Sequence, residues 1–116
     1  MATILVIDDS MLIRQQVSRA LTAAGYTVVL AEDGQDALEK LAATPDIAAA
    51  VCDINMPRMN GLEFLEQVGT KLSVVMLTTE GEPDLVTRAK ELGAKGWLLK
   101  PFKPEILVAA ARKLVA

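Results

Sequence analysis

Four segments of the chain end in side chains that phosphoryl-transfer chemistry can use. They are apolar runs that stop at Asp8-Asp9, at Asp53, at Thr78 and at Lys100. Continuous apolar runs of this length are typical of buried parallel strands, and the carboxyl ends of such strands line the ligand crevice of an open sheet. The sequence therefore predicts three carboxylates, a hydroxyl and an ammonium at one sheet edge. Such a set suits a divalent-cation site with an acceptor carboxylate and a cationic clamp for phosphate.

The carboxylates also have simpler explanations. Asp9 or Ser10 could cap the helix that follows the first strand, but capping accounts for only one residue of the Asp8-Asp9 pair. Mg²⁺ prefers oxygen ligands, often one or two carboxylates, although an Asp-Asp pair does not by itself establish a metal site. Asp53 could lie in a surface turn. It ends an Ala-Ala-Ala-Val-Cys run, however, where a carboxylate is costly to bury unless it is paired or coordinated.

Lys100 and Thr78 have simpler explanations as well. A lysine is usually a solvated surface residue, and threonine has a high strand propensity. Lys100, however, closes an apolar strand and precedes Pro101-Phe102. An ammonium there would offset the clustered carboxylates and pair with an incoming phosphate. The prediction of a cation and phosphate site therefore rests on all of these residues occurring together at successive strand ends.

The elements that must position these residues alternate between strand and helix. Strands are expected at 3–7, 27–31, 47–53, 73–78 and 95–100, and helices at 11–24, 35–43, 62–68, 83–92 and 104–115. Repeated strand–helix units predict a parallel sheet with helices on both faces. Segment 27–31 is the least hydrophobic of the strands, which suits the edge of the sheet.

Composition excludes several classes of protein. The chain has 116 residues, of which 52% are hydrophobic, and a net charge of −3. We expect one domain over residues 1–116, without the basic patch that nucleic-acid binding needs. No apolar stretch reaches the roughly 18 residues of a membrane span and the N-terminus does not resemble a signal peptide, so we expect a cytoplasmic protein. The absence of histidine excludes Ser-His and Cys-His catalysis, and the single cysteine, Cys52, should be a buried strand residue.

The motifs at the strand ends resemble those of the receiver domain of two-component response regulators. The resemblance covers the whole chain and rests on Ile7-Asp8-Asp9-Ser10, the loop from Asp53 to Gly61, Leu77-Thr78-Thr79 and Lys100-Pro101-Phe102. The blocks around Thr78 and Trp97 are most similar to the CheY-like, chemotaxis branch of the family. The resemblance implies an α/β, flavodoxin-like (βα)5 three-layer sandwich with a parallel five-stranded sheet in the order 2-1-3-4-5, for which CheY is the usual example.

The resemblance also implies how the acidic cluster would work. Mg²⁺ or Mn²⁺ would be bound by the side chains of Asp9 and Asp53 and by the backbone carbonyl of Asn55, with Asp8 binding it directly or through a water. Asp53 would accept a phosphoryl group from a histidine kinase. Lys100 would pair with Asp53 and then with the phosphate. With three nearby carboxylates and no metal, at least one pKa is expected to rise.

Further residues take roles from the same resemblance. Thr78 would move to hydrogen-bond the phosphoryl oxygens. Trp97 occupies the position of the switching aromatic residue, whose side chain turns toward the protein interior when Thr78 moves. Asn55, Thr79 and Glu80 hold positions that tune hydrolysis, and the bulk of Thr79 is expected to narrow access to the acceptor. The peptide before Pro101 is expected to be cis. The implied output face, to which a downstream protein would bind, consists of the segments 83–92, 95–100 and 104–115.

We therefore expect a phosphoacceptor switch that changes its binding to a partner, with no enzymatic activity beyond its own Mg²⁺-dependent phosphorylation and dephosphorylation. One alternative is a phosphorelay receiver that passes phosphate to a histidine phosphotransfer protein. A Mg²⁺-dependent phosphatase would need a substrate pocket and usually a cap domain, for which 116 residues leave little room. A flavin or nucleotide binder would need a Gly-rich phosphate loop after the first strand, where Asp8-Asp9-Ser10 stands instead.

Overall fold

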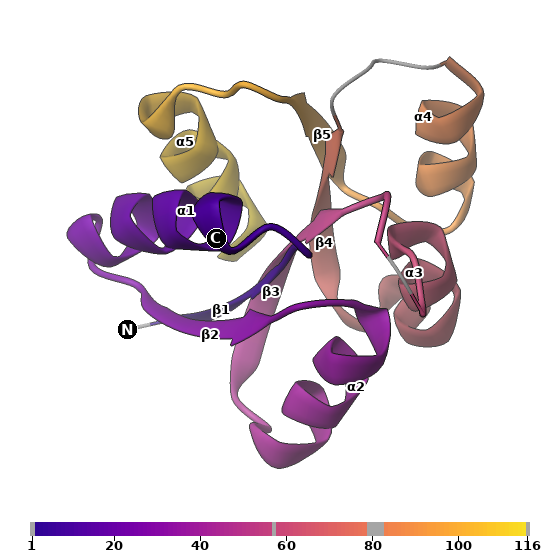
Figure 1. The fold of residues 1–116 in the computed structure, drawn as a ribbon, viewed down its shortest axis with the longest axis horizontal. Coiled ribbons are helices and arrows are strands. Elements are labelled where there is room, and N and C mark those ends of the chain that lie inside the picture. Colours follow the sequence, from indigo (N-terminus) through magenta and orange to yellow (C-terminus); the bar gives the residue numbers. More distant parts are fainter. Residues whose placement is uncertain (1, 57, 79–82, 116) are drawn as a thin grey trace.

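The chain folds into a parallel sheet covered by helices on both faces, in a computed structural model that describes residues 2–56, 58–78 and 83–115 (Figure 1). The strands are β1 (Thr3–Ile7), β2 (Thr27–Ala31), β3 (Ile47–Asp53), β4 (Ser73–Thr78) and β5 (Gly96–Leu99). The helices are α1 (Met11–Ala23), α2 (Gly34–Ala43), α3 (Gly61–Val68), α4 (Pro83–Glu91) and α5 (Pro104–Val115), with a short 3-10 helix, η1 (Gly69–Lys71). The sheet order is β2-β1-β3-β4-β5. The predicted (βα)5 flavodoxin-like fold and the edge position of β2 are thus confirmed.

Alternating strand side chains divide the core into two layers. Leu5 and Ile7 of β1 pack in the cluster that includes residues of α2, α3 and α4, whereas Ile4 and Val6 pack in the cluster formed with α1 and α5. Figure 1 shows the same division, with α1 and α5 on one face of the sheet and the other long helices on the opposite face. Because both faces of the central strands are covered, their sequences are continuously apolar.

Helix caps explain two of the predicted bounds that were wrong. α2 and α3 each begin one residue earlier than predicted, at a glycine, because Asp33 and Asn60 cap them. The Asp33 side chain accepts a hydrogen bond from the backbone N–H of Asp36 (2.9 Å), and the Asn60 side chain accepts one from Glu63 (2.9 Å). α1 and α4 each end one residue earlier than predicted, β5 is shorter by one residue at each end, and η1 was not predicted.

The start of α1 settles the two explanations for the Asp8-Asp9 pair. Ser10, not Asp9, caps the helix, and its side chain accepts a hydrogen bond from the backbone N–H of Ile13 (3.3 Å). Because Ser10 is the cap, capping does not explain the Asp9 carboxylate. Cys52 is buried with no exposed surface, as predicted for a strand residue. Within the described ranges, no helix has the length and apolar character needed to cross a bilayer.

Candidate functional site

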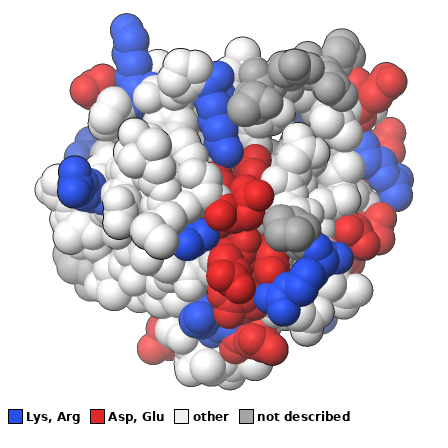
Figure 2. Space-filling view, viewed as in Figure 1, with Lys and Arg blue, Asp and Glu red and all other residues white. Residues whose placement is uncertain are grey.

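The register of the sheet brings the three predicted carboxylates together. Ile7 of β1 pairs with Cys52 of β3, so the residues that follow them, Asp8 and Asp53, lie side by side at the carboxyl ends of these strands. Asp8, Asp9 and Asp53 each offer a carboxylate oxygen, and these oxygens lie within 4.8 Å of one another. Figure 2 shows acidic side chains gathered in a band on this face, with lysine and arginine side chains beside it. The predicted acidic cluster is therefore present.

Lys100 joins two of these carboxylates. Its Nζ lies 2.8 Å from Oδ2 of Asp8 and 3.2 Å from Oδ1 of Asp53. The lysine is positioned by β4, because its backbone N–H donates to the carbonyl of Thr78 (2.7 Å), which itself pairs with Leu99 of β5. Its side chain is only 12% exposed, so the ammonium is not the solvated surface charge that an isolated lysine would be. The peptide between Lys100 and Pro101 is cis, as expected.

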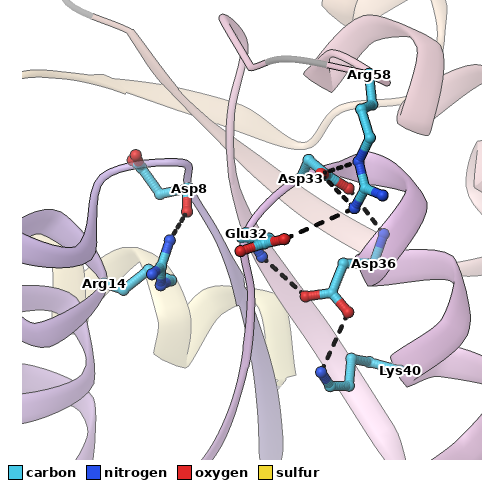
Figure 3. Close-up of polar contacts among 7 residues, drawn as sticks. All are labelled: Asp8, Arg14, Glu32, Asp33, Asp36, Lys40 and Arg58. Carbon is cyan, nitrogen blue, oxygen red and sulfur yellow. Dashed lines mark hydrogen bonds and ion pairs between the residues drawn. The ribbon is translucent and has the colours of Figure 1, made fainter.

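Asp8 is fixed by hydrogen bonds on every side. Its Oδ1 accepts from the backbone N–H of Ser10 (2.9 Å), and its own N–H donates to the carbonyl of Ala31 on β2 (3.1 Å). Its carbonyl accepts from Nη1 of Arg14 on α1 (2.5 Å; Figure 3). The Ser10 N–H and the Lys100 ammonium satisfy a carboxylate that has no exposed surface, while the other two bonds hold the Asp8 backbone. Asp8 is therefore a rigid part of the site.

The electrostatics of the site follow from burial and from the nearby charges. Burial raises the pKa of Asp53, and the charge of Asp8 raises it further, while Lys100 opposes the shift without cancelling it. Burial alone would lower the pKa of Lys100, but its hydrogen bond with Asp8 and the charges of Asp8 and Asp53 outweigh burial, so that pKa is raised. Lys100 thus stays an ammonium, and the expected rise of one carboxylate pKa falls on Asp53.

Asp53→Asn is expected to stabilise the metal-free protein. A carboxyl whose pKa is raised on folding loses stability as the pH rises through that pKa, so the ionised Asp53 destabilises the fold at about pH 7. Asparagine removes the charge and keeps the shape, while Lys100 keeps its contact with Asp8. In chelator we expect a gain on the order of 1 kcal/mol, or a rise in Tm of roughly 4 °C.

Thermal melts over a range of pH test this prediction. The gain should shrink as the pH falls through the folded pKa of Asp53, since the wild-type carboxyl then takes up its own proton. The exposed Asp46 offers the control Asp46→Asn, which should leave Tm nearly unchanged. A lower Tm for Asp53→Asn than for wild type, or a gain that does not vary with pH, would contradict the argument.

The donor set fits a hard divalent cation. Its three acidic residues supply oxygen ligands of the kind that Mg²⁺ and Mn²⁺ prefer, and Lys100 alone does not balance their charge. Asp9 is exposed, so a hydrated ion could reach the cluster from solvent. Asn55, whose backbone carbonyl was predicted to contribute, lies in the loop directly after β3 and is exposed.

Of the remaining predicted residues, Thr78 and Trp97 differ in burial. Thr78 is buried at the end of β4, 3% exposed, as expected for a residue at the same edge. Trp97 lies at the surface: the residue is 36% exposed, and Nζ of Lys90 lies 4.5 Å from the centroid of its ring. Thr79 and Glu80 lie outside the described residues.

Three residues near the edge were not singled out from the sequence. Arg14 holds the backbone of Asp8, as described above, and Arg58 and Asp33 form an ion pair between two loops (Figure 3). Asp33 had a detectable signal, because an aspartate directly before a helix that starts at a glycine is a strong capping candidate. The two arginines had none, since charged residues in a helix and a loop are usually solvated.

Comparisons with known proteins agree with the fold and identify the family. Residues 4–112 match the family model described as the response regulator receiver domain. The chain therefore belongs to the family of response regulator receiver domains.

Two relatives are similar over most of their length, and a third over about half of it. The chemotaxis protein CheY1 of Helicobacter pylori is 38% identical over 110 residues, which cover 90% of this chain and 89% of that protein. The structure of the chemotaxis protein CheY4 of Vibrio cholerae superposes with a TM-score of 0.92 at 41% identity over 98% of both chains. The response regulator MprA of Mycobacterium ulcerans is 40% identical over 116 residues, which cover 97% of this chain but 49% of MprA.

Proposed function

We propose that the protein is a phosphoacceptor switch in which Asp53 takes a phosphoryl group from a histidine kinase and thereby changes the binding of a downstream protein. The observation that carries the proposal is the position of the Lys100 ammonium, within 3.2 Å of Asp53 and 2.8 Å of Asp8, beside a cluster of three carboxylates. A carboxylate with a raised pKa next to a fixed cation is a typical arrangement for a reactive group rather than a structural one.

Transfer to Asp53 faces one main obstacle, because both the carboxylate and the incoming phosphate are negative. A carboxylate oxygen of Asp53 attacks phosphorus in line with the departing group, so positioning and charge stabilisation supply most of the catalysis. Lys100 shifts from the carboxylate to the phosphoryl oxygens as negative charge moves there. The Thr78 hydroxyl donates a hydrogen bond to one of these oxygens.

A divalent cation completes the proposed site. Asp9 and Asp53 would hold Mg²⁺ or Mn²⁺ through their carboxylates and Asn55 through its backbone carbonyl. Asp8 would contact it directly or through a water. When bound, the ion would supply positive charge that offsets the repulsion of the carboxylate and the phosphate. The reaction is confined to the protein's own phosphorylation and hydrolysis, and Asn55, Thr79 and Glu80 are proposed to tune the hydrolysis.

The proposed output face carries a groove between β5 and α5. It has a volume of about 560 Å³ and is lined by Trp97, Leu98, Ile106 and Ala109, together with Lys95 and Lys113. α5 buries Leu107 and Ala111 in the core, while Ile106 on its outer side is 51% exposed. An apolar groove with two lysines suits a partner segment that is apolar with acidic residues beside it.

Two observations bear on the pathway. CheY1 and CheY4 match this chain over nearly their whole length, which supports a chemotaxis-type switch. The identity to MprA is as high as that to CheY1, so identity alone does not separate the branches. A phosphorelay role stays the alternative. Incubation of the phosphorylated protein with a histidine phosphotransfer protein separates the two, because only a relay receiver should lose its phosphoryl group to that histidine.

Intact mass after incubation with Mg²⁺ and acetyl phosphate tests the central assignment. We expect a single phosphoryl adduct on the wild type, none on Asp53→Asn, and none on either protein in chelator. If the wild type shows no adduct, binding of beryllofluoride with Mg²⁺ distinguishes rapid hydrolysis from an inactive site. An adduct on Asp53→Asn would show that another residue accepts the phosphate, and the assignment of Asp53 would be wrong.

A further inference from the structure

The loop between β3 and α3 is tied to the start of α2 by an arginine. Nε and Nη2 of Arg58 both lie 2.6 Å from Oδ2 of Asp33. Oδ1 of Asp33 accepts the backbone N–H of Asp36 as the cap of α2. Asp33 is only 2% exposed, and Figure 3 shows the Arg58 side chain extending from its loop toward it. Hydrogen bonds between charged groups at this distance are among the strongest in proteins.

The backbone of the two loops fits together at the same place. The N–H of Gly34 donates to the carbonyl of Met59 (3.0 Å). A Cβ at position 34 would lie 2.6 Å from Cγ of Met59, so only glycine allows this approach. Arg58 itself has a φ of 61°, a conformation that non-glycine residues adopt only when the surroundings impose it. Here the ion pair to Asp33 is the shorter of the two acidic contacts that hold Arg58 in this conformation.

The other end of the loop is anchored to the sheet. The N–H of Ile54 donates to the carbonyl of Leu77 (3.2 Å), and the N–H of Gly61 donates back to the carbonyl of Ile54 (2.8 Å). Asn55, the proposed backbone ligand, follows Ile54 directly and is exposed. Arg58, three residues further along, ties the same loop to Asp33, a contact that these bonds at Ile54 do not supply.

We propose that Arg58 is a positioning residue for the cation site: by binding Asp33, it holds the β3–α3 loop in the conformation that presents the Asn55 carbonyl beside Asp9 and Asp53. The inference rests on the proposed function, because it assigns Arg58 a part in the same metal site. Groups that orient metal ligands without touching the metal commonly change metal affinity by about 10- to 100-fold when they are removed.

The charges around Arg58 support this assignment. Burial alone would raise the pKa of Asp33, but the hydrogen bond from Arg58 and the backbone N–H of Asp36 more than compensate, so the pKa is lowered and Asp33 stays ionised. Glu32, whose Oε1 lies 3.8 Å from Nη2 of Arg58, is the second acidic partner. The positive charge of Arg58 is thus paired with the acidic residues of the β2–α2 loop. The negative charge of the Asp8, Asp9 and Asp53 cluster remains for the cation to offset.

Calorimetric titration of Mg²⁺ into the metal-free protein tests the proposal. Arg58→Met keeps an unbranched, non-glycine side chain at a φ of 61° and removes the charge and the hydrogen bonds. We expect its Mg²⁺ dissociation constant to rise about 10-fold and the Gly34 amide to exchange with solvent faster, because its bond to Met59 loosens. Arg58→Lys should recover part of the affinity, since it restores the charge without the second N–H contact.

Two further variants make the test specific. Lys40→Met removes the ion pair between Lys40 and Asp36 (3.2 Å), which lies within α2 and does not include Arg58, and it should leave Mg²⁺ affinity unchanged. Asp33→Asn removes the charge of Asp33 but can still cap α2. Because Arg58 and Asp33 act through one contact, the double variant with Arg58→Met should weaken Mg²⁺ binding no more than the more severe single variant.

The failures of the two ideas differ. Wild-type protein that neither binds Mg²⁺ nor accepts phosphate would overturn the proposed function and this inference with it. Wild-type protein that binds Mg²⁺, beside a folded Arg58→Met variant with the same dissociation constant, would overturn the inference alone. Equal losses in Arg58→Met and Lys40→Met would also overturn it, because they would show a general effect of surface charge.

Discussion

Lys100→Met is expected to slow phosphorylation of Asp53 by acetyl phosphate about 100- to 1000-fold, the usual effect of removing a fixed group that stabilises transition-state charge. Methionine keeps most of the volume of the side chain and removes its ammonium, which lies between Asp8 and Asp53 in the structure. Phosphate would then approach two buried carboxylates with one cation fewer. The rate, followed by intact mass at saturating Mg²⁺, measures the effect on transfer.

The same variant should also change stability. Removing one partner of a buried ion pair leaves an uncompensated charge, at a cost of about 3–5 kcal/mol when burial is complete. The Lys100 side chain is 12% exposed, so its burial is not complete. We therefore expect a smaller loss of folding stability, about 2–3 kcal/mol in chelator. Mg²⁺ should recover part of it, because a cation near Asp8 and Asp53 replaces the missing charge.

Two comparisons complete this test. Lys100→Arg keeps the charge, but a guanidinium is bulkier than an ammonium, so we expect only partial recovery of the rate. Lys40→Met, which removes a half-exposed lysine on α2, should phosphorylate at the wild-type rate. A Lys100→Met variant that folds and is phosphorylated within about threefold of wild type would show that Lys100 has no part in the transfer.

The ends of the strands could be predicted because the signals there are local. β1 and β3 are continuously apolar until a carboxylate interrupts each, and both faces of these strands are buried in the structure. The placement of Asp8 beside Asp53 is not local, since it depends on the pairing of Ile7 with Cys52 across the sheet. That step came from the resemblance to receiver domains, which supplied the strand order.

The ion pair between Arg58 and Asp33 could not be predicted in this way. The two residues are 25 positions apart and lie in different loops, and neither is marked by an apolar pattern. Their contact depends on how closely the β3–α3 loop approaches α2, which the small size of Gly34 permits. Such a contact is a property of tertiary packing, and no period or propensity in the sequence encodes it.

The orientation of Trp97 has a similar cause. The sequence places an aromatic residue on the last strand, and the resemblance implies that it can turn inward. In the structure the ring lies outward, where Lys90 of α4 covers it at 4.5 Å. A cation over an aromatic face stabilises that orientation modestly, by about 0.5–1 kcal/mol at an exposed site. The choice between the two orientations depends on how α4 packs beside β5, which the sequence pattern does not determine.

Gly61→Ala is expected to destabilise the protein by about 3 kcal/mol, at the upper end of the cost of overpacking, and to lower Tm by roughly 10 °C. A Cβ at this position would collide with the carbonyl of Asp53 and lie 2.8 Å from Cα of Ile54, and neither backbone atom can turn away as a side chain could. Relief would require the start of the β3–α3 loop to move, and Asp53 with it. Phosphorylation should therefore slow as well.

Gly96→Ala is the matched control for this substitution. At position 96 of β5 the nearest atom to a new Cβ is Cγ2 of Val75 at 3.8 Å, an ordinary contact, and alanine loses less conformational freedom on folding than glycine. Its Tm should equal or slightly exceed that of the wild type in thermal melts. If Gly61→Ala melted at the same temperature as Gly96→Ala, the loop would be more adaptable than its anchors to the sheet imply, and the dependence of Asp53 on a fixed β3–α3 loop would fail with it.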